Sequence, residues 1–175
     1  MPSDNCEAYL DIETTGLSPF DCEITVVGIS LCDGESTRFV QLAGDGVTAE
    51  NILAALEGVS TVYTYNGSRF DFPFINYRLR VNLEELFEHR DLMYDCWRCN
   101  LRGGFKSVER QLGIERKLVE VNGYEAVRLW WRYVNDYDAD ALDTLLEYNK
   151  EDVLNLRALR ERLDSGSLDL PFSVA

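Results

Sequence analysis

The first half of the chain alternates short apolar runs with turn residues, a pattern that predicts β-strands. Three of these runs fit strands, and the second and third are rich in β-branched residues. They cover residues 6–12, 23–31 and 36–42. Asp33-Gly34 lies between the second and third runs and indicates a tight hairpin there.

The next segment predicts one helix and a fourth strand. Thr48 is a favourable N-cap, and apolar residues at helical spacing follow it over residues 49–57. Residues 59–65 fit another strand, which Asn66-Gly67 interrupts because this dipeptide favours a turn.

The second half of the chain is mostly helical in pattern. The expected helices cover residues 70–80, 91–101, 107–112 before Gly113, 123–135 and 138–164. Strands first and helices afterwards predict an α/β fold with a mixed central β-sheet flanked by α-helices. We expect a single domain over residues 1–164 and a flexible C-terminal tail over residues 165–175.

Composition fits a globular protein. The chain has 175 residues, of which 46% are hydrophobic, enough for one domain with a sizeable core. No apolar run is long enough to span a bilayer, and the start of the chain, MPSDNCEAY, lacks the basic and apolar regions of a signal peptide. We therefore expect a soluble cytoplasmic protein with no membrane partner.

The five cysteines are an odd number in a chain without an export signal, which favours reduced thiols. Cys96 and Cys99 form a C-x-x-C pair, but the sequence has no second pair to complete a structural zinc site. A redox dithiol is the alternative role for this pair.

Net charge restricts the kind of nucleic-acid binding that the chain can support. The formal net charge is −14, so a broad duplex-binding surface is not expected. The cationic residues are 14 Arg and 3 Lys, and guanidinium is the better bidentate ligand for phosphate.

Three separate stretches carry carboxylates at spacings that fit one site. Asp11 and Glu13 are two apart on the first strand and project from the same face. Asp71 follows a strand break, at the start of a helix. Tyr148 and Asp152 are four apart on the last helix and share a face. The spacing permits convergence, although each piece alone also fits a surface pair, a turn or a helix cap.

Converging carboxylates would need cations, because like charges raise one another's pKa. Hard oxygen ligands suit Mg²⁺ or Mn²⁺, and two such ions about 4 Å apart can activate water and stabilise a leaving oxygen. Tyr148 would orient or deprotonate that water. No histidine is required, and the single one, His89, is remote from these stretches in the sequence.

The stretches DIETTG, YNGSRFDFPFI and YNKEDV resemble, in this order, the three motifs of the DEDD superfamily of 3′–5′ exonucleases, which have the RNase H-like fold. The middle motif is similar to the proofreading domains of B-family DNA polymerases. Together with RDLM at 90–93 and KSVERQLGI at 106–114, the chain most resembles the stand-alone YprB-type subfamily, over about residues 7–160.

This resemblance implies roles for individual residues. The four metal-binding acids match Asp11, Glu13, Asp71 and Asp152, which would hold two ions. Tyr148 matches the water-orienting residue of the tyrosine (DEDDy) subtype, since the position of the alternative histidine is occupied by Glu147.

The resemblance also implies contacts with a terminal nucleotide. The matching positions are Thr14, Leu17, Asn66 and Phe70, and an apolar wedge with aromatic faces suits an unpaired 3′ end. We expect Lys106 to contact phosphate and Asp91 to anchor a loop.

The expected activity is metal-dependent 3′–5′ exonucleolytic hydrolysis of single-stranded DNA or RNA, releasing nucleoside 5′-monophosphates. The alternatives are a structure-specific endonuclease on the same fold and a non-catalytic nucleic-acid-binding or adaptor module. A protein partner could deliver the enzyme to its substrate. Residues Ser167 to Phe172 (SLDLPF) resemble a sliding-clamp-binding peptide, but serine replaces the usual leading glutamine. Trp130 and Trp131 suit core packing or, alternatively, base stacking.

Overall fold

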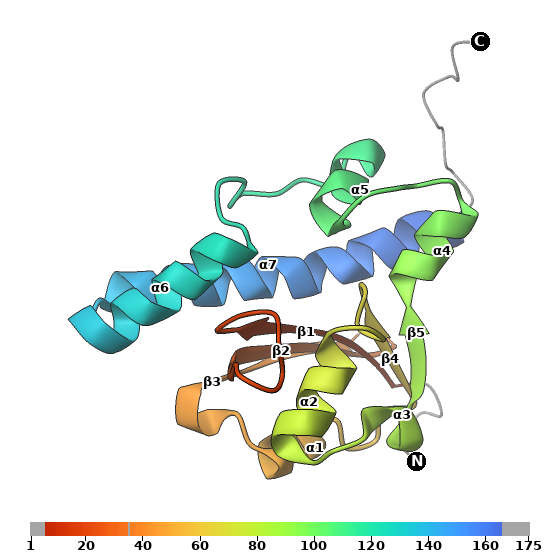
Figure 1. Cartoon of the computed structure of the whole chain (residues 1–175). Helices are drawn as coiled ribbons and strands as arrows, with labels where there is room; N and C mark the ends of the chain where they lie inside the picture. The colour runs from red at the N-terminus through yellow and green to blue at the C-terminus, as the bar shows by residue number, and fades with distance from the viewer. Residues whose placement is uncertain (1–5, 35, 166–175) are drawn as a thin grey trace.

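A single five-stranded mixed sheet forms the centre of the fold in the computed structural model, which describes residues 6–34 and 36–165 (Figure 1). The strands are β1 (Glu7–Thr14), β2 (Ile24–Asp33), β3 (Ser36–Ala43), β4 (Thr61–Thr64) and β5 (Glu88–Asp91). Their order across the sheet is β3-β2-β1-β4-β5. β1, β2 and β3 are antiparallel neighbours, whereas β4 pairs in parallel with β1 and with β5. The predicted α/β fold with a mixed sheet is confirmed.

The helices overlap the segments for which the sequence pattern predicts them, except for one short helix before residue 88 that the pattern does not predict. They are α1 (Ala49–Ala55), α2 (Asp71–Leu79), α3 (Leu83–Leu86), α4 (Leu92–Arg98), α5 (Phe105–Leu112), α6 (Gly123–Asp136) and α7 (Ala139–Asp164), with a 3₁₀ turn η1 (Gly44–Gly46). The Thr48 side chain accepts a hydrogen bond from the Asn51 N–H at 3.1 Å, so the predicted N-cap of α1 is confirmed. Gly113 ends α5 in the left-handed region at φ 63°, as predicted.

Three elements, η1, α3 and β5, are missing from the sequence-based assignment. β5 reads Glu-His-Arg-Asp, which has no β-branched residue and only one buried side chain, so neither composition nor periodicity indicates a strand. The helix expected over residues 91–101 is shorter, because Asp91 is the N-cap of α4 and the helix ends at Arg98. The tail expected over residues 165–175 and its clamp-like segment lie, apart from Ser165, outside the described residues.

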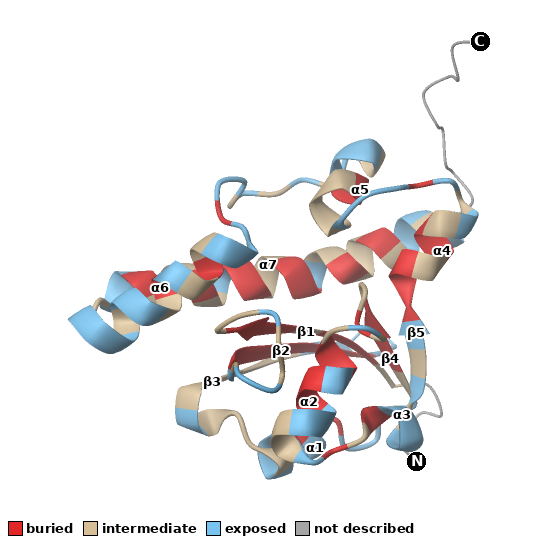
Figure 2. Ribbon diagram, viewed as in Figure 1, coloured by how far each residue is buried: buried red, intermediate tan, exposed pale blue. Residues whose placement is uncertain are grey.

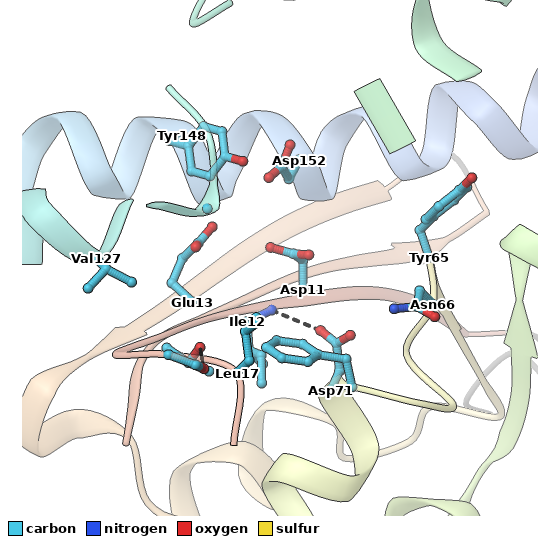
Figure 3. Close-up of a pocket in the computed structure, with 14 residues that line it drawn as sticks. Asp11, Ile12, Glu13, Leu17, Tyr65, Asn66, Asp71, Val127, Tyr148 and Asp152 are labelled. Carbon is cyan, nitrogen blue, oxygen red and sulfur yellow. Dashed lines mark hydrogen bonds between the residues drawn. The ribbon is translucent and has the colours of Figure 1, made fainter. Parts of the chain in front are cut away.

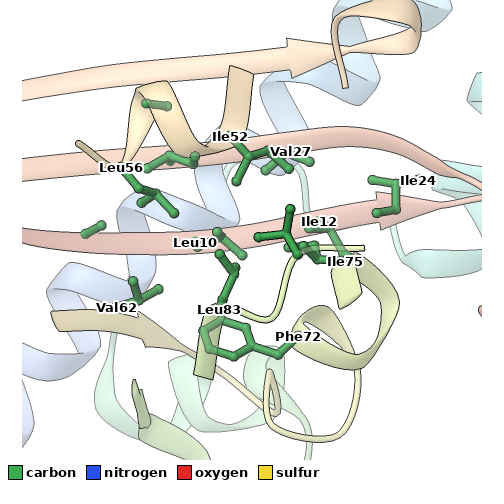
Figure 4. Packing of buried hydrophobic residues seen from close by; sticks show 14 of the residues in the cluster. Leu10, Ile12, Ile24, Val27, Ile52, Leu56, Val62, Phe72, Ile75 and Leu83 are labelled. Carbon is green, nitrogen blue, oxygen red and sulfur yellow. The ribbon is translucent and has the colours of Figure 1, made fainter. Parts of the chain in front are cut away.

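Strand β1 separates two apolar layers. Its residues Ala8, Leu10 and Ile12 are buried with α1 and α2 in one cluster (Figure 4). Tyr9, on the other face, packs in a second cluster with residues of α4, α5 and α7. Asp11 and Glu13 continue this second face, so the alternation of the strand directs both carboxylates towards α7.

Helix α7 crosses the sheet on the face opposite to α1 and α2 (Figure 1). Its side towards the sheet is buried, as are β1 and β2 beneath it (Figure 2). Leu145, Val153, Leu156 and Leu159 are at most 1% exposed. Since burial of one such side chain contributes about 1.5–3 kcal/mol, these four fix the helix firmly on the sheet.

Trp130 and Trp131 differ in environment. Trp130 is half-buried against the cluster that contains Leu129 and Leu145, so the core-packing interpretation is confirmed for this residue. Trp131 is 44% exposed, so that interpretation is wrong for its neighbour. Two adjacent helical residues point about 100° apart, which prevents both from facing the same core.

The cysteine pair gives no support to redox chemistry. All five cysteines are free thiols, and Cys96 is fully buried. Burial raises the pKa of Cys96 to about 12. A reactive dithiol requires a lowered pKa, so the environment of this thiol is that of a structural residue.

Candidate metal-dependent nuclease site

Asp11, Glu13 and Asp152 meet between the sheet and α7. Carboxylate oxygens of these three residues lie within 4.8 Å of one another. Asp11 and Glu13 point from β1 towards α7, and Asp152 and Tyr148 point from α7 towards the strand (Figure 3). The spacing of two on the strand and four on the helix therefore places four of the five predicted groups together.

Asp71 reaches the site from the first turn of α2. Its Oδ1 accepts a hydrogen bond from the backbone N–H of Ile12 at 3.0 Å (Figure 3). This N–H is available because β4 pairs with β1 only from Glu7 to Tyr9 and ends at Thr64. Asp71 is 3% exposed, and its carboxylate is not one of the three whose oxygens cluster within 4.8 Å. It thus borders the acid cluster from the other side of β1.

A glycine on β2 lets α7 approach the sheet. Gly28 is the strand partner of Asp11, and a Cβ built on it would lie 2.8 Å from Val153 and would also overlap Asn149. Asn149 is fully buried and donates to the Asp11 carbonyl and to Asp11 Oδ2, both at 3.1 Å. Its own amide oxygen accepts from Gln41 at 2.9 Å. This chain of contacts fixes α7 over Asp11.

A hollow of about 320 Å³ opens beside the acids. The four predicted contacts with a terminal nucleotide, Thr14, Leu17, Asn66 and Phe70, all line it. Leu17 is 87% exposed, as a wedge at the mouth of a site would be. The sequence analysis did not single out Tyr65, Gly123 and Val127, which line the hollow as well.

Lys106 and Asp91 lie where the sequence analysis expects a role for each. Lys106 lines an adjoining hollow that shares Asp11, Tyr148 and Asp152 with the first. Its ammonium donates to the Val121 carbonyl and lies 4.8 Å from the centre of the Tyr148 ring. The Asp91 carboxylate accepts from the backbone N–H groups of residues 66, 68 and 93, so the predicted loop anchor is confirmed.

Arg116 is a site residue that the sequence analysis missed. Its guanidinium donates to Asp152 and makes two hydrogen bonds, of 2.9 and 2.7 Å, to Glu109. Only 5% of the Arg116 side chain and 2% of the Glu109 side chain are exposed. Nη1 has no hydrogen-bond partner among the described residues, although Glu151 lies 3.8 Å away. A buried cation therefore offsets part of the negative charge of the acids.

Burial and mutual repulsion raise the pKa of every acid in the site. Burial is the largest cause for Asp11 and Glu13, and the neighbouring carboxylates, Asp152 first, raise both pKa values further. Burial raises the pKa of Asp71 to about 7, even though the Ile12 N–H favours the ionised form. Burial also raises the pKa of Asp152, to about 6, against the opposing effect of Arg116. The metal-free site therefore keeps protons on its carboxyl groups up to a higher pH than separate, exposed acids would.

The hydroxyl of Tyr148 keeps its proton. Burial, followed by the charges of Asp152, Glu13 and Asp11, raises its pKa well above the ordinary value. A phenol of this kind donates a hydrogen bond and does not act as a base at neutral pH. His89 does not line either hollow; its ring stacks on Phe72 with centroids 3.9 Å apart.

The donor set fits a hard divalent cation. Asp11, Glu13 and Asp152 offer carboxylate oxygens, with Asp71 beside them, and neither hollow is lined by a thiol or imidazole. Oxygen-only ligands are typical of Mg²⁺ and Mn²⁺. A bound cation would also lower the raised pKa values, because it favours the ionised carboxylates.

Within the described part of the chain, no helix combines the length and apolarity that crossing a bilayer requires. The placement in the cytoplasm stays a prediction.

Comparison with known proteins finds a relative in sequence. Over 111 residues the chain is 33% identical to YprB, an uncharacterised protein of Bacillus subtilis (strain 168), in a match that covers 58% of this chain and 27% of YprB. The chain thus spans about a quarter of that relative's length.

Two solved structures share the fold. NrnC of Brucella melitensis, solved bound to pGG, superposes with a TM-score of 0.61 at 21% identity, covering 91% of this chain and 72% of NrnC. The family B DNA polymerase of the archaeon Pyrobaculum calidifontis gives a TM-score of 0.64 at 14% identity, covering 94% of this chain and 26% of the polymerase.

The family model of the RNase H superfamily matches residues 8–164, a range that contains the sheet except for Glu7, helix α7 and all five residues of the predicted site. The protein therefore belongs to the RNase H superfamily and has a nuclease-like RNase H fold.

Proposed function

We propose that the protein is a metal-dependent 3′–5′ exonuclease of the tyrosine subtype, acting on single-stranded DNA or RNA. The observation that carries the proposal is the convergence of Asp11, Glu13 and Asp152 within 4.8 Å, beside Tyr148 and Asp71. A binding module has no need to hold several carboxylates against their repulsion. A solved nuclease, which superposes on 91% of this chain with a TM-score of 0.60, and the family B DNA polymerase share this fold, which supports the same class.

In this proposal, hydrolysis transfers the terminal nucleotide to water. The water oxygen bonds to phosphorus, the bond from phosphorus to the preceding 3′ oxygen breaks, and that oxygen takes up a proton. The products are a nucleoside 5′-monophosphate and a strand shortened by one nucleotide. Bound Mg²⁺ or Mn²⁺ ions would supply charge neutralisation and activation of water. Asp11, Glu13, Asp71 and Asp152 would hold them.

The other residues position the substrate and the water. Tyr148, which keeps its proton, donates a hydrogen bond that orients the attacking water. Leu17 and Phe70 contact the terminal base on its apolar faces, and Thr14 and Asn66 contact it through polar groups. Lys106 pairs with phosphate, whose negative charge would favour the protonated ammonium against burial and the neighbouring Arg116, which lower the pKa of Lys106.

A cleavage assay tests the proposal. Wild type is incubated with 5′-labelled single-stranded DNA and RNA in Mn²⁺, Mg²⁺ or EDTA, next to Asp152→Asn and Glu13→Gln. The matched control is Asp143→Asn, an exposed acid on the same helix. We expect a metal-dependent ladder that shortens from the 3′ end in wild type and in the control, and none in the two site variants.

Circular single-stranded DNA separates the rival functions. An exonuclease cannot start on a circle, so cleavage of the circle would establish an endonuclease instead. Absence of cleavage of every substrate, with binding unchanged by EDTA, would establish a non-catalytic module.

A further inference from the structure

A cluster of two exposed arginines and two half-buried aromatic residues lies next to the hollow. The arginine–aromatic patch consists of Arg69, Tyr94, Trp97 and Arg102. The Arg69 guanidinium lies 5.8 Å from the centre of the Tyr94 ring and 5.6 Å from that of Trp97. Arg102 lies 5.8 Å from the centre of Trp97, and the two rings contact edge to face at 5.3 Å. These contacts restrict two long side chains that would otherwise be mobile.

Both ends of the patch are attached to the wall of the hollow. Arg69 directly precedes Phe70, and the neighbouring Ser68 hydroxyl lies 3.4 Å from the Tyr94 hydroxyl. Tyr65, which lines the hollow, donates to the carbonyl of Gly103, the residue after Arg102, at 2.8 Å. The patch therefore continues the surface that Tyr65, Asn66 and Phe70 begin.

The two arginines are available for an external anion. Both are exposed, and within residues 6–34 and 36–165 neither lies within 4 Å of a carboxylate. By contrast, Arg98 on the same surface pairs with Asp95, and Arg90 pairs with it too. In a chain with a net charge of −14, two exposed guanidinium groups without a carboxylate partner among the described residues give this surface a local positive charge.

We propose that this patch binds the phosphates of the nucleotides that precede the 3′ end, so that the strand runs from the hollow across Arg69 and Arg102. This inference rests on the proposed function and assigns the path of its substrate. A guanidinium held over a ring keeps its N–H edge free for phosphate oxygens, and the ring offers a sequence-tolerant surface to a base. Binding at two defined points explains how an acidic protein holds an anionic strand without a broad basic surface.

The test compares Arg69→Gln/Arg102→Gln with a control that removes equal charge elsewhere. Arg80→Gln/Arg162→Gln is suitable, because both residues are exposed and neither lines the hollow; Arg80 also lies over an aromatic ring, that of Tyr77. One substrate is an oligothymidylate of about 12 nucleotides. The other is the p-nitrophenyl ester of thymidine 5′-monophosphate, in which the nitrophenolate leaving group replaces all preceding nucleotides.

We expect the patch variant to lose at least tenfold in kcat/KM on the oligonucleotide and to stay within about twofold of wild type on the ester. In binding measurements with the labelled oligonucleotide, the slope of log affinity against log salt should fall in magnitude by about 1.4, or about 0.7 for each lost phosphate contact. The control variant should match wild type in all three measurements.

Equal losses on both substrates, or a loss that the control variant shares, would overturn the proposal. Failure of the proposed function is a separate result, since wild type would then hydrolyse neither substrate. In that case the binding measurements with the labelled oligonucleotide still test the role of the patch. Weaker binding with a reduced salt slope in the patch variant supports the patch, and unchanged binding refutes it.

Discussion

The stability of the metal-free protein should fall as the pH rises from about 5 to about 8. The acids of the site have raised pKa values in the folded state, so the folded protein binds more protons than the unfolded chain in this range. When the folded state binds more protons, the free energy of unfolding decreases with rising pH. The decrease ends above the folded-state pKa values.

Asp71 sets the magnitude of this effect. Burial raises its pKa from 3.8 to about 7, so over about two pH units, from about pH 5 to pH 7, Asp71 holds a proton in the folded state that it has lost in the unfolded chain. At about 1.4 kcal/mol for each unit, Asp71 alone lowers the free energy of unfolding by about 3 kcal/mol. Contributions from Asp11, Glu13 and Asp152 act in the same direction but do not add, because the four groups titrate as one coupled site. The lowered pKa of His89 acts in the opposite direction, since stability from a neutral histidine increases with pH.

The assay is urea unfolding in EDTA, followed by tryptophan fluorescence, at several values between about pH 5 and pH 8. The matched variant is Asp71→Asn, whose amide oxygen can still accept the hydrogen bond from the Ile12 N–H. In this variant we expect the free energy of unfolding to fall by about 3 kcal/mol less than in wild type between about pH 5 and pH 7. Mn²⁺ should stabilise wild type by about 2.7 kcal/mol at a hundred times its dissociation constant, and more strongly at pH 8 than at pH 5. Identical pH profiles for wild type and Asp71→Asn would refute the reasoning.

Three further predictions follow from single contacts. Arg116→Met should lower the free energy of unfolding by about 3–5 kcal/mol, because Glu109 would be left buried without its cationic partner. A second change, Glu109→Gln, should recover much of the lost stability in urea unfolding, and equal stabilities of the single and double variants would contradict the prediction. Tyr148→Phe keeps the ring and should lower kcat about 100-fold with little change in KM, whereas an unchanged kcat would exclude the hydroxyl from the reaction. Gly28→Ala should lower the free energy of unfolding by about 1–3 kcal/mol, and it should also lower the rate of cleavage, because the added methyl group would move Asn149 away from Asp11. A methyl group at Gly46 would meet no atom within 4 Å, so Gly46→Ala should change neither stability nor cleavage.

The sequence was sufficient to predict the features that depend on local periodicity. β1 and α7 both carry regular patterns: on β1 the acids lie on the face that also bears Tyr9, and on α7 Tyr148 and Asp152 lie on the buried face. The two spacings therefore permitted the convergence of Asp11, Glu13 and Asp152, which the packing of α7 on the sheet brings about. Strand β5 could not be predicted, because its pairing with β4 does not depend on its side chains.

Contacts between distant segments were not predictable for a related reason. Arg116 lies in the connection between α5 and α6, 36 residues from Asp152, and no periodic pattern relates the two positions. Gly28 reads as an ordinary interruption of a β-branched strand until α7 is placed above it. Asn149 was inside a recognised motif, yet its role depends on Gln41 and Asp11, which lie on other elements.

The donors around the acids bear on whether folding requires a metal. Arg116 pairs with Asp152, Asn149 donates to Asp11, and the Ile12 N–H donates to Asp71. Each acid that has such a donor can remain in place without a cation, and raised pKa values allow protons to remove the remaining repulsion. Small zinc domains differ, because the metal supplies most of their folding free energy. Here the apolar layers on both sides of the sheet supply it, so a chelator should abolish cleavage while leaving the circular dichroism of the folded protein unchanged. Loss of helical signal in EDTA at neutral pH would show that these donors do not suffice.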